Sequence, residues 1–330
     1  MYNTYLWKIK PLSSQMTPWQ SDTIYGHLLY GASLLYGDEF VKKLIDEFSN
    51  IPPFIVSDGF IDGQLPMINK GTVKRSDTEE FAKIYGKNQI ETVKKLKEIN
   101  KIKFIPIEDF NKLREKNYNK KDFIISKLQE LNKEEENANS IDFKSKKLDK
   151  KDTAIQETLV MHNTINRIMG STGDNGVFAL KETFIEGNIF IFIKIRKDFD
   201  INILDTLLKF VEKNGYGKKV SSGKGAIERV SFEKYNEFNE VKNGNGFIVL
   251  SNYIPKEFDY EEVISANYLV KKGKVYGDID FPFKKPFSCF TAGSLFKKSK
   301  NSIYGKVLKD IHIDKNIVQI GIPFTLEVEL

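Results

Sequence analysis

Cysteine and long apolar runs are scarce in this chain of 330 residues. The single cysteine, Cys289, cannot form an internal disulfide and cannot build a thiolate metal site alone, so we expect an inert core or edge residue. No apolar run approaches the roughly eighteen residues that a bilayer span requires. The amino terminus lacks the basic and apolar segments of a secretory signal, so we expect a soluble, cytoplasmic protein.

Histidine is also scarce, which limits the chemistry available to the chain. Its histidines are His27, His162 and His312, and their spacing suits no zinc site. Neither a GGDD sequence nor an HD pair is present to hold divalent metals. We therefore expect no metal, no cofactor, and neither polymerase nor metal-nuclease activity.

Positive charge is supplied mainly by lysine and is unevenly distributed. The 51 basic residues include only five arginines, and the net charge is +6. Residues 271–309 carry +8 and residues 209–225 carry +4, whereas residues 94–151 carry +6 in a stretch of mixed sign. A positive balance favours polyanionic partners through counterion release, but alone it does not establish nucleic-acid binding.

Hydrophobic periodicity predicts an α+β fold. Strands are expected at 2–11, 54–60, 176–183, 188–196 and 226–232, with helices beginning near Ser21 and at 203–213. This order of strands and helices is typical of the split βαβ unit of ferredoxin-like (RRM-like) domains, which we place at 1–233. The lysine- and asparagine-rich stretch at about 71–151 is interpreted as a partly mobile insertion outside the core, with helical periodicity at 81–96 and 122–131.

The remainder, 234–330, is expected to form a second domain. Apolar strands are predicted at 246–250 and 317–330, with short helical and turn segments between them. A second ferredoxin-like unit fits this pattern, although no repeat aligns with the first.

The loop GYGKKVSSGKG, residues 215–225, is the first candidate site. Its four glycines would let backbone N–H groups approach phosphates, while lysines supply charge and serines supply short donors. A flexible connector before an edge strand is the equally weighted alternative. The loop lacks the GxxxxGK[ST] spacing of a nucleotide-binding P-loop.

Three other segments are candidates. The hydroxyl-rich run PLSSQMTPWQSDTIYGHLLYG precedes a helix whose N-terminus could bind an anion, the alternative being simple capping by Ser21 or Asp22. In MHNTINRIMGSTGDNGVF, His162 or Asn163 could share a helical face with Arg167, whose guanidinium suits a bidentate or stacking role. FTAGSLFKKSK places Gly293 and Ser294 at a tight turn, which could equally be an ordinary turn.

Taken together, these segments resemble a known family. The runs PLSSQMTPWQSDTIYGHLLYG, LPMINKG with KKLKEINKIKFIPIEDFNKL, MHNTINRI, GYGKKVSSGKG, AGSLF and IVQIGIPFTLEV occur in the order seen in the fourth Csm subunit of type III-A CRISPR complexes. That subunit is a member of the RAMP superfamily. The resemblance covers nearly the whole chain.

The resemblance implies a non-catalytic subunit that holds the 5′ repeat-derived handle of crRNA. It implies two ferredoxin-like RAMP domains with a thumb-like insertion, and protein partners in the large polymerase-like subunit and the backbone RAMP subunit. The RNA-binding residues that it implies are Ser13, Ser14, His27, Arg167, Gly217, Lys218, Lys219, Ser221, Ser222, Gly223, Lys224, Gly293 and Ser294.

Two alternatives stay open. A metal-independent RAMP endoribonuclease that processes precursor crRNA would need a histidine for general acid/base transfer. His27 lies on an apolar helical face, where a packed or hydrogen-bonded state is expected instead. A backbone RAMP subunit would share the fold class, so the fold alone could not separate these functions.

Overall fold

The computed structural model describes residues 2–139, 154–256, 262–275, 280–298 and 304–330. At its centre lies a four-stranded antiparallel sheet in the order β2-β7-β1-β8. Its strands are β1 (Tyr2–Pro11), β2 (Phe54–Ile61), β7 (Ile189–Arg196) and β8 (Ile227–Lys234). The helix α1 (Ser21–Tyr36) follows β1 and α7 (Ile201–Asn214) follows β7. The predicted α+β class and the split βαβ order are therefore confirmed.

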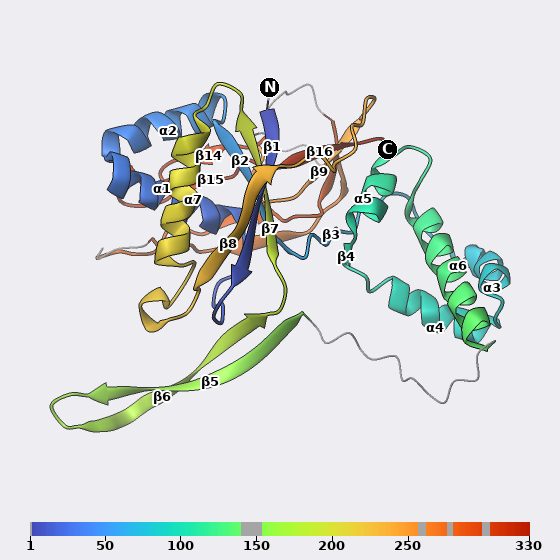
Figure 1. Cartoon of the computed structure of the whole chain (residues 1–330), viewed down its shortest axis with the longest axis horizontal. Helices are drawn as coiled ribbons and strands as arrows, with labels where there is room; N and C mark the ends of the chain where they lie inside the picture. The colour runs from blue at the N-terminus through green and yellow to red at the C-terminus, as the bar shows by residue number, and fades with distance from the viewer. Residues whose placement is uncertain (1, 140–153, 257–261, 276–279, 299–303) are drawn as a thin grey trace.

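Alternation along β1 explains how this sheet is covered. Trp7 and Ile9 are fully buried on one face, and the Trp7 indole Nε1 donates a hydrogen bond of 2.7 Å to Glu212 in α7. On the other face of the sheet, Phe192 of β7 packs against Phe324, with ring centroids 6.3 Å apart. The helices α1, α7 and α2 (Asp38–Asn50) thus lie on one side and the C-terminal part on the other (Figure 1).

The C-terminal part contains a second antiparallel sheet in the order β10-β13-β9-β16. Its strands are β9 (Gly246–Val249), β10 (Val263–Ser265), β13 (Leu295–Lys297) and β16 (Thr325–Val328). Two further pairs join β11 (Tyr268–Lys271) to β12 (Phe287–Phe290) and β14 (Val307–Leu308) to β15 (Gln319–Ile320). None of the residues described after Lys234 lies in an α-helix, so the helical segments expected there are not found in that part.

Residues 65–139 form a helical region on the far side of the second sheet (Figure 1). It contains β3 (Leu65–Pro66), η1 (Arg75–Asp77), α3 (Thr78–Tyr85), α4 (Gln89–Ile99), β4 (Phe104–Ile105), α5 (Ile107–Arg114) and α6 (Lys120–Asn139). Helix α6 confirms the periodicity seen at 122–131, whereas the stretch 81–96 is divided between α3 and α4, with residues 86–88 between them. Residues 140–151 of the predicted insertion lie outside the described residues. Among the helices described, none is long and apolar enough to span a bilayer.

This helical region contributes to the main hydrophobic core. Phe81, Phe110 and Phe123 are buried in the same cluster as Trp7 and Phe324. The expectation of an insertion outside the core is therefore wrong for the described part of it. The lysine-rich composition of this segment misled the prediction. An amphipathic helix buries its apolar side whatever the net charge of the segment.

Three cations, of which Arg114 and Lys70 are buried and Lys194 is half-buried, hold the C-terminal segment 325–329 against the rest of the protein. Lys194 of β7 donates to the Thr325 carbonyl at 2.5 Å, Arg114 of α5 donates to Glu327 O at 3.0 Å, and Lys70 donates to Glu329 O at 2.9 Å. These bonds satisfy alternate carbonyls of the C-terminal segment that would otherwise lack a strand partner. The first sheet, the helical region and the second sheet are thereby joined.

A long two-stranded arm projects from the body of the protein (Figure 1). It consists of β5 (Ile155–Asn166) and β6 (Ser171–Ile185), with residues 167–170 forming the turn. The strand predicted at 176–183 is confirmed, but the helical face proposed for His162, Asn163 and Arg167 is wrong. His162 lies opposite Phe178 in the ribbon. Cross-strand pairing decides the structure of this segment, and a helical spacing over so few residues does not.

Candidate nucleic-acid interface

The loop 215–225 adopts a tightly defined conformation that depends on glycine. Gly217 and Gly225 have φ angles of +85° and +69°, a region that side chains rarely adopt. A Cβ atom on Gly225 would lie 2.0 Å from the Tyr216 carbonyl oxygen, and one on Gly217 would lie 2.6 Å from Thr17 Cβ. The glycines therefore allow the loop to pack against the segment between β1 and α1.

Backbone amides of this loop are used within the protein. The Gly217 amide donates to His27 Nε2 at 3.0 Å, the Lys218 amide donates to Thr17 Oγ1 at 3.0 Å, and the Gly225 amide donates to Ser14 O at 2.9 Å. The expectation that these amides approach phosphates is therefore wrong. The glycines serve packing, and charge recognition is left to the side chains.

Segment 13–20 packs against the loop and fixes its position. The Ser13 hydroxyl accepts a hydrogen bond from the Ala226 amide at 2.9 Å. The Tyr216 hydroxyl donates to the Pro18 carbonyl at 2.8 Å, and its ring stacks on Trp19 with centroids 3.7 Å apart. We call residues 13–20 and 215–225 together the loop platform.

Glu182 of β6 joins the loop platform to the base of the arm. Its Oε2 atom accepts hydrogen bonds from Ser14 Oγ at 2.6 Å and Lys224 Nζ at 2.7 Å. Its Oε1 atom lies 3.5 Å from His162 Nε2. The Lys224 ammonium, followed by the Ser14 hydroxyl, lowers the pKa of this carboxyl. Glu182 thus brings together three segments that the sequence analysis had selected separately.

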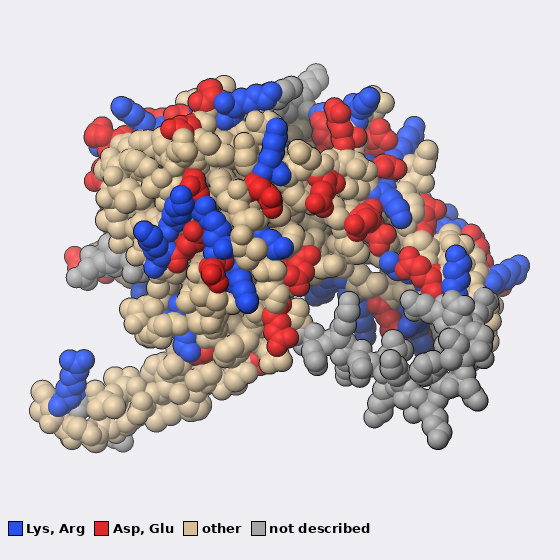
Figure 2. Space-filling view, in the orientation of Figure 1, with Lys and Arg blue, Asp and Glu red and all other residues tan. Residues whose placement is uncertain are grey.

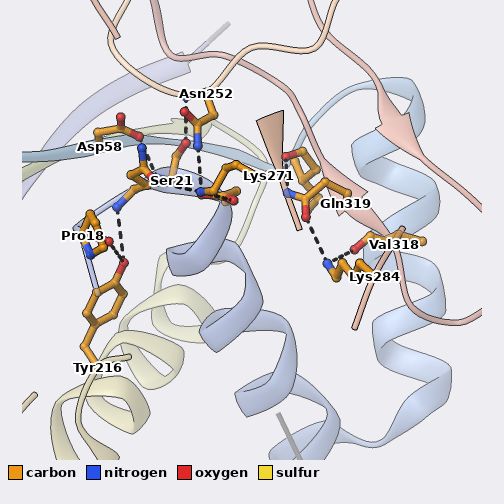
Figure 3. Close-up of polar contacts among 12 residues, drawn as sticks. Pro18, Ser21, Asp58, Tyr216, Asn252, Lys271, Lys284, Val318 and Gln319 are labelled. Carbon is orange, nitrogen blue, oxygen red and sulfur yellow. Dashed lines mark hydrogen bonds and ion pairs between the residues drawn. The ribbon is translucent and has the colours of Figure 1, made fainter. Parts of the chain in front are cut away.

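The N-terminus of α1 is occupied by a protein carboxyl group. Asp58 of β2 accepts a hydrogen bond from the Ser21 amide at 2.7 Å, and the Ser21 hydroxyl accepts one from the Asn252 amide at 3.0 Å (Figure 3). Neither Ser21 nor Asp22 caps the helix with its own side chain. Burial raises the pKa of Asp58 to about 7. The open anion site predicted at this helix end is therefore filled by Asp58.

The outer surface of the loop platform is basic and hydroxyl-rich. Lys218, Lys219, Ser221, Ser222 and Gly223 are exposed to solvent, whereas Lys224 is partly buried in its ion pair with Glu182. The exposed side chains can bind an anion without breaking an internal hydrogen bond of the loop. Ammonium groups beside hydroxyls suit phosphate oxygens.

The predicted site residues separate into groups. Ser13, Ser14 and His27 pack against the loop, and Lys224 within the loop pairs with Glu182, so all four residues stabilise its conformation. Arg167 is exposed in the turn at the far end of the arm, away from the loop (Figure 1).

Gly293 and Ser294 occupy the predicted tight turn in the C-terminal part. Gly293 has a φ of +90° and lines a cavity of about 620 Å³ that Trp19, Asp58 and Phe60 also line. Ser294 is fully buried, and its hydroxyl donates to the Thr291 carbonyl at 2.8 Å. Ser294 therefore stabilises the turn and is closed to a ligand in this conformation.

Sequence reasoning missed Glu182 altogether, and it did not single out Thr17 or Tyr216 within the two segments that it selected. Glu182 lies 168 residues from Ser14 and 42 residues from Lys224, and no local motif marks it. Tyr216 is inside the glycine-rich run, and an aromatic residue between two glycines was the available signal of an anchored loop.

The geometry defines an α+β protein in which a split βαβ sheet carries a lysine-rich loop and a projecting arm. Its fold is similar to that of a chain in the crystal structure of the Csm3-Csm4 subcomplex of the type III-A CRISPR-Cas interference complex. That match has a TM-score of 0.61, 18% sequence identity, and covers 100% of both chains. A chain of the Csm1-Csm4 cassette in complex with pppApA matches with a TM-score of 0.57 and 13% identity, covering 100% of this chain and 99% of that one.

A third similar structure is the Csm1-Csm4 cassette in complex with AMPPNP, with a TM-score of 0.56 and 14% identity over 100% of this chain and 99% of that one. No protein-family model matches the sequence, and no curated protein matches it. At these identities the likeness establishes a common fold over the full length of the chain.

Proposed function

We propose that this protein is a non-catalytic crRNA-binding subunit of a type III-A CRISPR-Cas effector complex. In that role it holds the 5′ repeat-derived handle of crRNA and bridges a large polymerase-like subunit to a backbone RAMP subunit. The observation that carries the proposal is the full-length fold similarity to chains of two different Csm assemblies. Csm4 is the component that these two assemblies have in common.

The loop platform supports the RNA-binding part of the proposal. Lys218 and Lys219 project from a loop that is already fixed by His27, Thr17 and Ser14, so little ordering is needed on binding. Two adjacent ammonium groups on a loop whose backbone is already fixed can contact phosphates of a nucleic-acid strand.

The state of His27 supports a non-catalytic role. Its Nε2 atom accepts the Gly217 amide hydrogen bond, and burial lowers its pKa to about 4. At neutral pH the imidazole is therefore uncharged and cannot act as a general acid. To act as a general base, His27 would have to give up the hydrogen bond that Nε2 accepts from the Gly217 amide.

The arm supports assembly with other subunits. Its exposed large apolar side chains include Leu159, Met161, Ile165, Ile168, Met169, Val177 and Phe178. Few charged side chains interrupt this surface (Figure 2). An apolar surface of this extent on a projecting ribbon favours burial against another macromolecule. We propose that the neighbouring backbone subunit covers it.

Co-expression with the other subunits and a repeat-containing precursor RNA tests this function. We expect the purified assembly to contain short RNAs with a common 5′ repeat end, and we expect omission of this chain to release the large subunit. Recovery of RNAs with random ends, or stoichiometric retention of the large subunit without this chain, would contradict the proposal.

Incubation of the isolated protein with precursor RNA tests the absence of catalysis. We expect no specific cleavage with or without magnesium. Specific cleavage that is abolished by His27→Ala would favour the processing endoribonuclease instead.

A further inference from the structure

A second surface with nucleic-acid-binding chemistry lies in the C-terminal part. We call residues 268–275 and 280–290 the C-terminal ribbon. Tyr268 pairs with Phe290 and Lys271 with Phe287, and an isolated bridge between Lys274 and Phe283 extends the pairing. The Val275 amide donates to the Pro282 carbonyl at 2.7 Å. The two chain segments therefore form one continuous antiparallel ribbon.

Alternation gives this ribbon two different faces. Leu269, Phe287 and Cys289 pack inward against Ile254 and Ile311. The outward side chains are large and solvent-exposed, with exposed fractions of 75% for Tyr268, 65% for Val270, 64% for Phe281 and 54% for Phe283. Three of these four side chains are aromatic. Exposed apolar side chains grouped in this way mark an interaction surface.

Lysines are interleaved with the outward aromatic rings. Lys272, Lys274 and Lys285 are exposed, and Lys272 Nζ lies 5.2 Å from the centroid of the Phe283 ring. Asp280 is the one acidic side chain within the described residues of the ribbon. Protein interfaces are depleted in lysine at their centres, whereas single-stranded nucleic acids bind to aromatic platforms flanked by positive charge. The composition therefore favours a single-stranded polyanion.

Two other ribbon lysines attach it to the body and are unavailable to a ligand. Lys271 Nζ donates to Gln20 Oε1 at 2.7 Å and pairs with Asp22 at 2.6 Å (Figure 3). Lys284 Nζ donates to the Val318 carbonyl at 2.7 Å, and burial lowers its pKa to about 8. Charge on the ribbon is thus divided between structural lysines and outward lysines.

The ribbon is attached to segment 13–20, against which the glycine-rich loop also packs. Gln20, which accepts from Lys271, is part of the loop platform, and Pro18 in the same segment accepts from Tyr216. Both contacts lie at the N-terminus of α1 (Figure 3). The loop and the ribbon are therefore both attached to segment 13–20, which fixes one relative to the other.

We infer that the outward face of the C-terminal ribbon is a stacking surface for unpaired nucleotides of the RNA held at the loop platform. The inference rests on the proposed function, because it assigns a second contact to the same RNA. Tyr268, Phe281 and Phe283 stack on bases, while Lys272, Lys274 and Lys285 contact phosphates. This surface tolerates any base, because stacking uses the ring face rather than its hydrogen-bonding edge.

The test measures binding of a fluorescent unstructured RNA to three variants of the full chain. The first carries Tyr268→Ala, Phe281→Ala and Phe283→Ala, the second carries Lys272→Ala, Lys274→Ala and Lys285→Ala, and the control carries Ile90→Ala. Ile90 is 71% exposed in α4, so its loss removes exposed apolar surface elsewhere.

The aromatic variant should bind about tenfold more weakly for each stacked base that is lost, with an unchanged salt slope. The lysine variant should show a smaller salt slope, by about 0.7 for each lost phosphate contact. The control should bind like the unaltered protein. Quenching of 2-aminopurine placed in the RNA should decrease in the aromatic variant, which reports stacking directly. Far-ultraviolet circular dichroism verifies that each variant keeps its fold, because its signal comes from the backbone and not from the aromatic rings that are removed.

The outcomes separate this inference from the proposed function. If the unaltered protein binds no RNA, both fail. If the loop variant Lys218→Ala with Lys219→Ala weakens binding but both ribbon variants bind normally, the proposed function stands and the ribbon inference is wrong. If the ribbon variants bind RNA normally but no longer retain the large subunit in the co-expressed assembly, the ribbon contacts a protein partner. That result would also overturn the inference.

Discussion

The backbone amide of Gly217 donates a hydrogen bond to Nε2 of His27, across 190 residues of chain and a distance of 3.0 Å. This bond fixes the first residues of the glycine-rich loop against α1, which contains His27. It also requires a neutral imidazole, because a protonated Nε2 atom could not accept the hydrogen bond. The position of the loop is therefore coupled to the protonation of one histidine.

Stability should depend on pH through His27. Burial lowers its pKa in the folded protein from 6.5 to about 4, so protons bind the unfolded state preferentially between these values. We expect the free energy of unfolding to fall as pH decreases through this window. In His27→Asn this part of the decrease should disappear, since asparagine does not titrate. Chemical denaturation at several pH values measures it, and superimposable profiles for the two proteins would contradict the assignment.

Lys218 and Lys219 should contribute more to RNA binding than lysines of the helical region. Replacing both by alanine should reduce the salt slope by about 0.7 per lost phosphate contact and weaken the affinity. The matched control is Lys94→Ala with Lys97→Ala, two exposed lysines of α4. Titrations across a salt series decide the question. Equal losses would mean that net charge, rather than the fixed loop, holds the RNA.

Gly225 should tolerate no side chain. Gly225→Ala would place a Cβ atom 2.0 Å from the Tyr216 carbonyl at a φ of +69°, and we expect destabilisation of about 2 kcal/mol or more. Gly26→Ala is the control, because nothing lies within 4 Å of its Cβ position and alanine favours the helix by about 1 kcal/mol. Thermal unfolding compares them. A neutral Gly225→Ala would show that the backbone of residue 225 can move away from that of Tyr216 at little cost.

Glu182 and Lys224 should be energetically coupled. Lys224→Met leaves a buried carboxylate with one fewer donor, and Glu182→Gln removes the charge that holds Lys224. A double-mutant cycle should give a larger coupling than the same cycle for the exposed pair Glu39 and Lys42. The arm base should also become more accessible to hydrogen exchange in either single variant. A coupling no larger than that of the exposed pair would remove Glu182 from its proposed joining role.

Arg114 should be required for attachment of the C-terminal strand. Arg114→Met removes the donors to Glu327 O and Asn111 Oδ1 within a buried site, and we expect a loss of about 2 kcal/mol in stability. Arg75→Met, at an exposed position, should change stability by less than about 0.5 kcal/mol. Urea unfolding measures both. Similar values for the two variants would mean that packing alone holds β16.

The sequence by itself determined the elements of the first sheet and the exposed chemistry of the loop. Alternation in 2–11 placed Trp7 and Ile9 on a buried face, and periodicity after Ser21 gave α1, because each pattern records which side of an element avoids water. The lysines and glycines of 215–225 were equally visible.

Tertiary structure alone decided which of these residues are exposed and which support others. Asp58 caps α1 in place of Ser21. Glu182 accepts hydrogen bonds from both Ser14 and Lys224. The segment around His162 forms a strand because it pairs with β6, although its spacing had suggested a helix. Each of these partners comes from a distant part of the chain, and local periodicity carries no record of which distant residue will lie opposite. The same limit hid the core of the helical region, where burial is set by neighbouring elements and not by the net charge of the segment.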